Sequence, residues 1–253
     1  MTKFTRADDL KGAQFVGVNL RGARILESDV SGLVIRGSEV AGLEIDAPWL
    51  SDGEPVRVNG VDIVPLVEAE LDRQFPGREL RRAETPDGLR EAYETVQRAW
   101  ATPLEQAAAL PAGAVDESVD GEWSFAQTLR HLVGATDIWL RHAVQRVEQP
   151  FHPLGVFGDY ADEGPFDLSM LTSGQPTYDE VLAARADRVG MVRDFLDTVT
   201  AAQLDEPRAN PWAPAHPETV RSCLHTILEE EWEHLRFAVR DLGTIAARAA
   251  EAG

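Results

Sequence analysis

The first 47 residues carry a repeat with a period of five. Apolar residues recur at every fifth position from Leu10 to Ile45, and glycine recurs with the same period except at Glu27. A period of five would spread an apolar stripe around an α-helix and would alternate between the two faces of a β-strand. It fits a square solenoid whose sides are five residues long, each directing its central residue toward the axis. The eight repeats, over about residues 8–47, would make two coils.

This segment resembles the pentapeptide-repeat family, whose A(D/N)LXX pattern is seen here in ADDLK, GAQF and GVNLRGARI. The resemblance implies a right-handed quadrilateral β-helix over residues 1–47. Some members of that family mimic DNA with an acidic rod, an interpretation that charge can test. The chain has a net charge of −19, but residues 1–47 hold six basic and seven acidic side chains. A nearly neutral segment favours a docking or structural module over a DNA mimic.

Composition and charge exclude several classes of protein. The chain has 253 residues, 43% of them hydrophobic, so it can bury a substantial core. Its 43 acidic residues against 24 basic ones argue against nucleic acid as a partner. No apolar run is long enough for a membrane helix and no signal-peptide pattern opens the chain, so we expect a cytoplasmic protein without a membrane partner. The single cysteine, Cys223, agrees with a reducing compartment and excludes a zinc ribbon built from thiolates.

Residues 48–84 form a predicted connector. The segments VRV and VDI flank the Asn-Gly pair at 59–60, which is a strong hairpin signal. A short helix is expected over about residues 65–75, and a Pro-Gly break follows it.

Residues 85–253 carry the pattern of long amphipathic helices. Capping-box pairs at Ser124/Gln127 and Thr177/Glu180 start two of them, and Pro103 predicts a distortion in the first. Four long helices with apolar stripes predict a four-helix bundle, which makes the fold class α+β but mainly α. The connecting loops are long and rich in Pro and Gly, so we expect them to carry function. Helices are expected over about residues 86–109, 124–147, 177–199 and 217–249, with the long loops at 148–176 and 203–216.

The last helix contains a pair of residues that can bind a metal. In HTILEEEWEH, Glu230 and His234 lie about 40° apart on one face, whereas His225 points the opposite way. That face is otherwise apolar, so the carboxylate points inward and needs a partner or a metal. In the second helix His131 can border the core, whereas His142 lies about 16 Å further along the axis. His131, Glu230 and His234 offer two imidazoles and one carboxylate, which suit zinc or another borderline divalent ion.

Each of these residues also has a simpler interpretation. A Glu/His pair four residues apart is common on solvated helices, and a lone histidine is more often a satisfied polar group than a ligand. We interpret Glu229, Glu231 and Glu233 as a solvated face, and Cys223 as a small buried hydrophobe. The tryptophans at positions 100, 123, 139 and 232 are interpreted as core. The spacing alone leaves both a metal site and an ordinary helix pair open.

A second resemblance covers about residues 85–247. The segments WSFAQTLRHLVGATDIWLRHAV and CLHTILEEEWEHLRFAVRDL resemble the DinB-like superfamily, and within it the branch of mycothiol-dependent maleylpyruvate isomerase and related low-molecular-weight-thiol S-transferases. In that branch a histidine of the second helix and E-x-x-x-H in the last helix ligate a divalent metal. Carried over, these ligands are His131, Glu230 and His234. The resemblance implies zinc, with nickel, iron or manganese as alternatives.

The chemistry that this resemblance implies is the activation of a small thiol, such as mycothiol, for attack on a small-molecule electrophile. The result would be S-transfer or isomerisation. The alternatives are a metal-dependent hydrolase and a non-enzymatic, metal-stabilised interaction or stress-response module. No general base or substrate-binding residue is assigned, although His142, His152, Asp159 and His216 are candidates for lining a pocket. The thiol, the electrophile and the oligomeric state, a homodimer included, stay open.

Overall fold

The structure is a computed structural model that describes residues 2–51, 53–158, 161, 164–172 and 174–252. The chain divides into two compact units, residues 1–46 and residues 47–253. Residues 48–84, predicted as a connector, belong to the second unit. The division into three parts at residues 47 and 84 stays a prediction.

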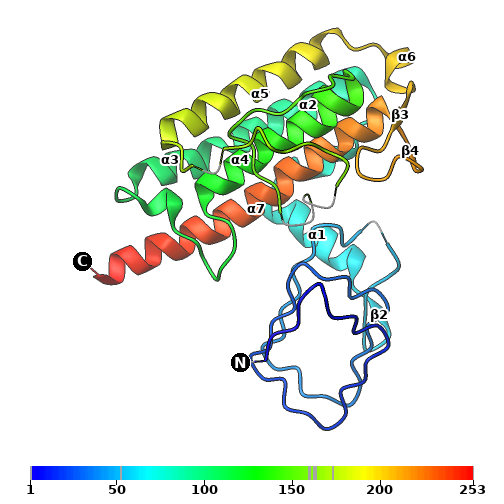
Figure 1. Cartoon of the computed structure of the whole chain (residues 1–253), viewed down its shortest axis with the longest axis vertical. Helices are drawn as coiled ribbons and strands as arrows, with labels where there is room; N and C mark the ends of the chain where they lie inside the picture. The colour runs from blue at the N-terminus through cyan, green and yellow to red at the C-terminus, as the bar shows by residue number, and fades with distance from the viewer. Residues whose placement is uncertain (1, 52, 159–160, 162–163, 173, 253) are drawn as a thin grey trace. The chain divides into compact units, whose positions relative to one another are not determined.

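In the first unit the backbone turns with the period of the sequence (Figure 1). The recurring glycines have φ between +62° and +76°, and Glu27, which takes the place of a glycine, has a φ of +46°. Backbone hydrogen bonds recur every ten residues, from Ala13 N to Leu10 O through Leu43 N to Val40 O, each 2.9 Å long. A Cβ disfavours this left-handed conformation. The need for it at each turn explains why glycine recurs at every fifth position.

The first unit has no buried core. Every side chain of the described residues 2–46 is exposed, and none of these residues lies in a β-strand. The side chains expected to face the axis range from 43% exposed at Leu10 to 65% exposed at Ile25. The structure therefore leaves this apolar row accessible to solvent. The structure does not show the predicted right-handed quadrilateral β-helix, which stays a prediction.

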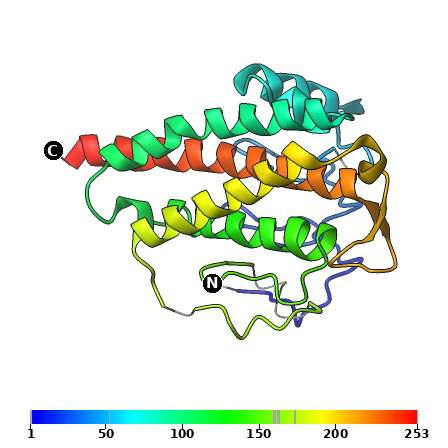
Figure 2. The same cartoon turned by 90° about the horizontal axis from the view of Figure 1, so that it is seen from above.

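The second unit is mainly helical. Its longest helices pack side by side, with α4 against α5 and α7, and α2 against α5 and α7 (Figures 1 and 2). These helices are α2 (Pro86–Ala99), α4 (Phe125–Thr136), α5 (Tyr178–Thr198) and α7 (Val220–Ala252). The shorter helical elements are α1 (Val64–Gln74), η1 (Arg78–Arg82), α3 (Ala101–Ala109), η2 (Ala114–Asp116), the π-helix η3 (Asp137–Val144) and α6 (Ala201–Leu204).

The helix starts follow the caps in the sequence. Ser124 and Thr177 accept hydrogen bonds from the backbone N–H groups three residues later, and the Gln and Glu at those positions complete both capping boxes. The first predicted helix is divided at Trp100 into α2 and α3. The division comes before Pro103, the predicted distortion, because proline has no N–H to donate to the carbonyl four residues earlier and its ring crowds that carbonyl.

Two further features depart from the predicted pattern. The second predicted helix continues beyond Thr136 as the π-helix η3, where one extra residue enters the helical turn. The last helix begins at Val220 rather than at about 217, because the residues before it pair as a strand. The predicted hairpin at Asn59-Gly60 is confirmed. The strands are β1 (Arg57–Val58), β2 (Val61–Asp62), β3 (Pro207–Ala209) and β4 (Pro217–Thr219), which pair as β1–β2 and β3–β4, both antiparallel.

The core of the second unit lies between the long helices. Tyr93 on α2, Leu129 on α4 and Trp232 on α7 are each no more than 2% exposed. Trp100 and Trp139 are also buried, as expected, whereas Trp123 is only half-buried. None of the helices in the part of the chain that the structure describes has the length and apolar character needed to cross a bilayer.

Candidate metal centre

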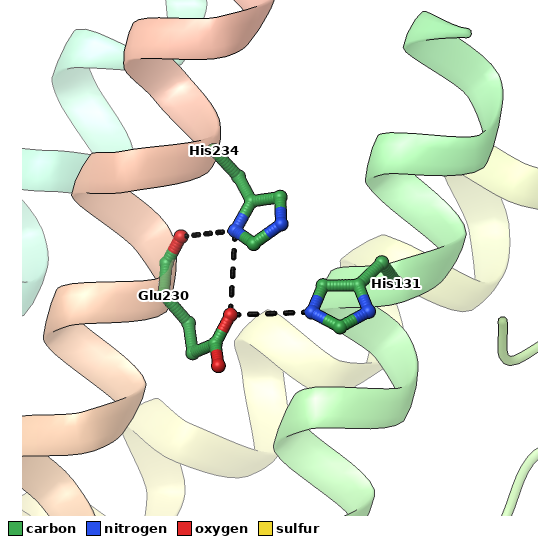
Figure 3. A group of neighbouring side chains, drawn as sticks. All are labelled: His131, Glu230 and His234. Carbon is green, nitrogen blue, oxygen red and sulfur yellow. Dashed lines mark hydrogen bonds and ion pairs between the residues drawn. The ribbon is translucent and has the colours of Figure 1, made fainter. Parts of the chain in front are cut away.

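Three of the predicted site residues meet between two helices. His131 projects from α4, and Glu230 and His234 project from α7 toward it (Figure 3). One potential ligand atom from each residue lies within 4.8 Å of the other two. His131 and His234 are 5% and 9% exposed, and the Glu230 side chain is 12% exposed. The local cause is the capped start of α4, which fixes the phase of His131, and the four-residue spacing on α7.

The hydrogen bonds of His131 determine which of its nitrogens carries a proton. Its Nδ1 lies 3.2 Å from the backbone oxygen of Val156, which can only accept. Nδ1 therefore donates, and Nε2 of the neutral ring presents a lone pair. That Nε2 lies 3.2 Å from Oε2 of Glu230, which is also an acceptor when ionised. Two acceptors face each other at hydrogen-bond distance, so a cation, either a proton or a metal, is needed between them.

His234 is held in the same tautomer by its own helix. Its Nδ1 lies 2.9 Å from the backbone oxygen of Glu230 and 3.3 Å from the Glu230 carboxylate (Figure 3). Both neighbours accept, so Nδ1 carries the proton and Nε2 keeps its lone pair.

Burial and charge keep Glu230 and His234 in the protonation states that a metal needs. Burial lowers the pKa of His234 to about 4, and repulsion from His131 adds to that effect. Burial alone would raise the pKa of Glu230, but a hydrogen bond from His131, when its Nε2 carries the proton, and the charges of His131 and His234 outweigh it and lower that pKa. At neutral pH the site thus contains a neutral His234 and an ionised Glu230, which are the ligand forms of both groups.

The donor set fits zinc. Two imidazole nitrogens and one carboxylate oxygen are common zinc ligands, and three protein ligands leave a position for an external group. Zinc bonds of about 2.0–2.2 Å in a tetrahedron place neighbouring ligand atoms roughly 3.3 Å apart. The 3.2 Å separation between His131 Nε2 and Glu230 Oε2 agrees with that edge.

Aromatic rings surround the three side chains. The Trp123 ring lies 4.6 Å from the His131 ring and 6.3 Å from the His234 ring, between centroids. Phe157 meets His131 edge-on at 6.4 Å, and Phe237 meets His234 edge-on at 5.6 Å. Trp123 is therefore part of the site's wall rather than of the central core. The apolar rings also limit water around the site and strengthen its electrostatic interactions.

The other candidate residues lie away from this group. Nδ1 of His142 is 3.2 Å from the Val147 oxygen, and His152 Nδ1 accepts from the Leu154 N–H. His225 donates to the Ala83 oxygen from the far side of α7, as its phase predicted. His216 is exposed in the loop before β4. Asp159 lies outside the described residues.

The neighbouring acidic residues of α7 do not form a solvated face, so that expectation is wrong. Glu231 is 1% exposed and forms an ion pair with Arg185 of α5, with one N–O distance of 2.6 Å. Glu233 is 7% exposed and pairs with Arg78 and Arg236. Arg185 of α5, Arg78 of η1 and Arg236 of α7 itself supply the partners that make burial of these carboxylates tolerable.

Several residues that shape the site could not be found from the sequence. The Val156 oxygen is a backbone group, and no residue type marks it. Asp137, which is fully buried, resembles any other charged residue of a helix in the sequence. One signal was present in the sequence, the glycine at 134 in the middle of α4. Glycine inside a helix lowers its stability, so its presence there indicates a local packing requirement.

Comparison with known proteins gives the family. The model of the DinB superfamily matches residues 95–238, which is more than half of the chain and includes all three candidate ligands. Neither the curated proteins nor the solved structures contain a match. On the strength of the family match, the chain belongs to the DinB superfamily.

Proposed function

We propose that this protein is a metal-dependent enzyme of the thiol S-transferase or isomerase type, with zinc held by His131, Glu230 and His234. The observation that carries the proposal is a group of three atoms with lone pairs, His131 Nε2, Glu230 Oε2 and His234 Nε2. The first two of these atoms lie 3.2 Å apart. The resemblance of the sequence to the mycothiol-dependent branch supports the thiol as cosubstrate.

The residues of the site would have different roles in this reaction. Val156 and the backbone of Glu230 hold the two imidazoles with Nε2 available, and the Glu230 carboxylate supplies negative charge that offsets a divalent ion. When bound, zinc would lower the pKa of a small thiol in its remaining position and so favour the thiolate that attacks an electrophilic carbon. The rings of Trp123, Phe157 and Phe237 would exclude water from that thiolate.

The attacking thiol would come from outside the chain. The chain has one cysteine, Cys223, and it is fully buried. Burial and the charge of Glu218 raise the pKa of its thiol to about 12. A thiol in that state is not a nucleophile at neutral pH.

The first test is the metal content of the purified full-length protein after exposure to zinc and gel filtration. We expect one zinc per chain in the parent and less than a tenth of that in His131→Ala and Glu230→Ala. His216→Ala, which changes an exposed histidine, is the matched control and should keep the metal. Equal zinc in all four proteins would contradict the site.

The second test is turnover of an electrophile by the zinc-loaded protein with and without added mycothiol. Thiol-dependent turnover that is lost in Glu230→Ala supports the transferase. Turnover without a thiol would favour a hydrolase instead.

A second candidate function is a non-enzymatic interaction module, and the first unit favours it. Fifteen large hydrophobic side chains of residues 4–45 are exposed. The net charge of residues 1–47 is −1, whereas the rest of the chain carries −18. If residues 8–47 form the two-coil pentapeptide-repeat segment, a second copy of the same coil offers matching apolar rows at the same period without charge repulsion.

Light scattering of the full chain tests this second candidate. A dimer that becomes a monomer when Phe15 and Ile25, both exposed, are replaced by Ser supports association through the coil. A monomeric parent protein at high concentration would contradict it. Thiol-dependent turnover decides separately whether the protein is also an enzyme.

A further inference from the structure

A fully buried carboxylate lies six residues beyond the candidate ligand His131. Asp137, the first residue of the π-helix η3, is 0% exposed. Its Oδ1 accepts from Nε of Arg188 on α5 at 2.9 Å, and its Oδ2 accepts from the backbone N–H of His152 at 2.7 Å. Arg141 also donates to its Oδ1, at 3.3 Å. A carboxylate at this depth therefore connects a helix of the bundle to the loop that follows η3.

That loop runs back along α4 toward the candidate metal centre. We call residues 150–157 the strap. Arg130 binds the strap through two hydrogen bonds. Its side-chain Nε donates to the Leu154 oxygen at 2.8 Å, and its backbone oxygen accepts from the Val156 N–H at 3.3 Å. Within the strap, the Gly155 N–H donates to the His152 oxygen at 2.9 Å and closes a turn. A displacement of the His152 backbone would therefore also displace Val156, because this hydrogen-bonded turn connects them.

The strap ends on the candidate ligand itself. The Val156 oxygen accepts the Nδ1 proton of His131 at 3.2 Å. Glu230 alone would favour the opposite tautomer, because a proton on Nε2 would satisfy its carboxylate at 3.2 Å. That opposite tautomer would block the lone pair that a metal needs. The Val156 oxygen opposes it, as a carbonyl beyond the first ligand shell commonly does for a metal-binding histidine.

A glycine gives the strap its close approach to α4. A Cβ at Gly134 would lie 2.6 Å and 2.7 Å from two ring atoms of Phe157, so any larger residue must displace that ring. The same ring meets His131 edge-on. Gly134 and Phe157 thus fit together beside the ligand, independently of the ion pairs of Asp137.

We propose that Asp137 is a positioning residue for His131, acting through the strap to keep Nδ1 protonated and Nε2 available. This inference rests on the proposed function only for its effect on metal affinity. The hydrogen bond from His131 Nδ1 to the Val156 oxygen is a property of the metal-free protein, whether or not Nε2 also carries a proton there. Its failure can therefore be distinguished from the failure of the metal site.

The test is a long-range ¹H–¹⁵N spectrum of the histidines in the chelator-treated full chain, with His131 assigned from the signals that His131→Ala loses. In the parent we expect a proton on His131 Nδ1. In Asp137→Asn we expect the Nδ1 proton to be lost, which leaves the ring protonated at Nε2 alone, and a zinc affinity 10- to 100-fold weaker by competition titration.

The matched control is Glu231→Gln, which neutralises another buried carboxylate, one that pairs with Arg185 of α5 rather than with the strap. It should leave the His131 ring signals unchanged and the zinc affinity within about threefold. If Asp137→Asn does not fold, Asp137→Glu tests the same link, because it keeps the charge but displaces the carboxylate that accepts from the His152 N–H. Ring signals of His131 that are unchanged in a folded Asp137→Asn or Asp137→Glu protein would overturn the proposal, even where the parent binds zinc.

Discussion

Nε2 of His131 and Oε2 of Glu230 lie 3.2 Å apart, although 99 residues separate them in the chain. Neither atom has a proton of its own to donate in the ligand forms of the two groups, since Nδ1 of His131 is already bonded to a carbonyl. Without a cation between them the contact is repulsive. The relationship explains why a metal would stabilise the packing of α4 on α7.

Zinc should raise the thermal stability of the protein. A ligand at 100 times its dissociation constant stabilises the folded state by about 2.7 kcal/mol, which for a unit of this size shifts the Tm by about 5–10 °C. Circular dichroism at 222 nm with and without zinc measures the shift. His234→Ala should remove it, and His216→Ala, an exposed change, should keep it. A zinc-induced shift that survives in His234→Ala would point to binding elsewhere.

Metal binding should change the fluorescence of Trp123. Its ring lies 4.6 Å from His131, whereas Trp100 and Trp232 are buried in the core. The chain has six tryptophans, so the signal is identified by difference. Trp123→Phe should bind zinc but lose most of the emission change, and Trp100→Phe should retain it. An unchanged titration signal in Trp123→Phe would show that the metal does not bind beside this ring.

The metal-free protein should lose stability in mild acid because of His234. Its pKa is about 4 in the folded state and near 6.5 when unfolded, so between these values the unfolded chain binds more protons. Stability is therefore present at neutral pH and falls as the pH drops below about 6.5, by on the order of 2 kcal/mol between pH 7 and pH 5. Urea unfolding at both pH values, compared with His234→Gln, isolates this contribution. An identical pH dependence in the variant would rule out His234 as its cause.

Removal of Cys223 should leave catalysis intact. Its thiol is buried with a pKa raised to about 12, and the proposed nucleophile is an added thiol. Cys223→Ala should therefore keep thiol-dependent turnover within twofold, with a loss of stability of at most about 2 kcal/mol. The measurement is the initial rate at saturating thiol, with circular dichroism as the control for folding. A tenfold loss of rate in the folded variant would mean that the chain supplies its own nucleophile.

Local signals explain the parts of the fold that the sequence predicted. The capping boxes at Ser124 and Thr177 and the Asn-Gly turn at 59–60 act within a few residues, and each starts the element expected. The π-helix η3 could not be predicted, because its first residue, Asp137, is fixed by Arg188 from another helix. The pairing of β3 with β4 was also missed, since both strands are three residues long and carry no alternating pattern.

The site was predictable to the extent that helix geometry determines it. The four-residue spacing of Glu230 and His234 guarantees a shared face, and the cap of α4 allows His131 to border the core. Whether the two helices place these residues together depends on packing across the whole bundle. The Val156 oxygen, which selects the tautomer of His131, is a backbone atom with no mark in the sequence.

The most direct test of the metal centre is anomalous X-ray scattering at the zinc edge from crystals of the full chain grown with zinc. We expect one strong peak between α4 and α7, bonded to His131, Glu230 and His234. No peak at these side chains, in crystals whose diffraction shows zinc bound elsewhere on the chain, would contradict it.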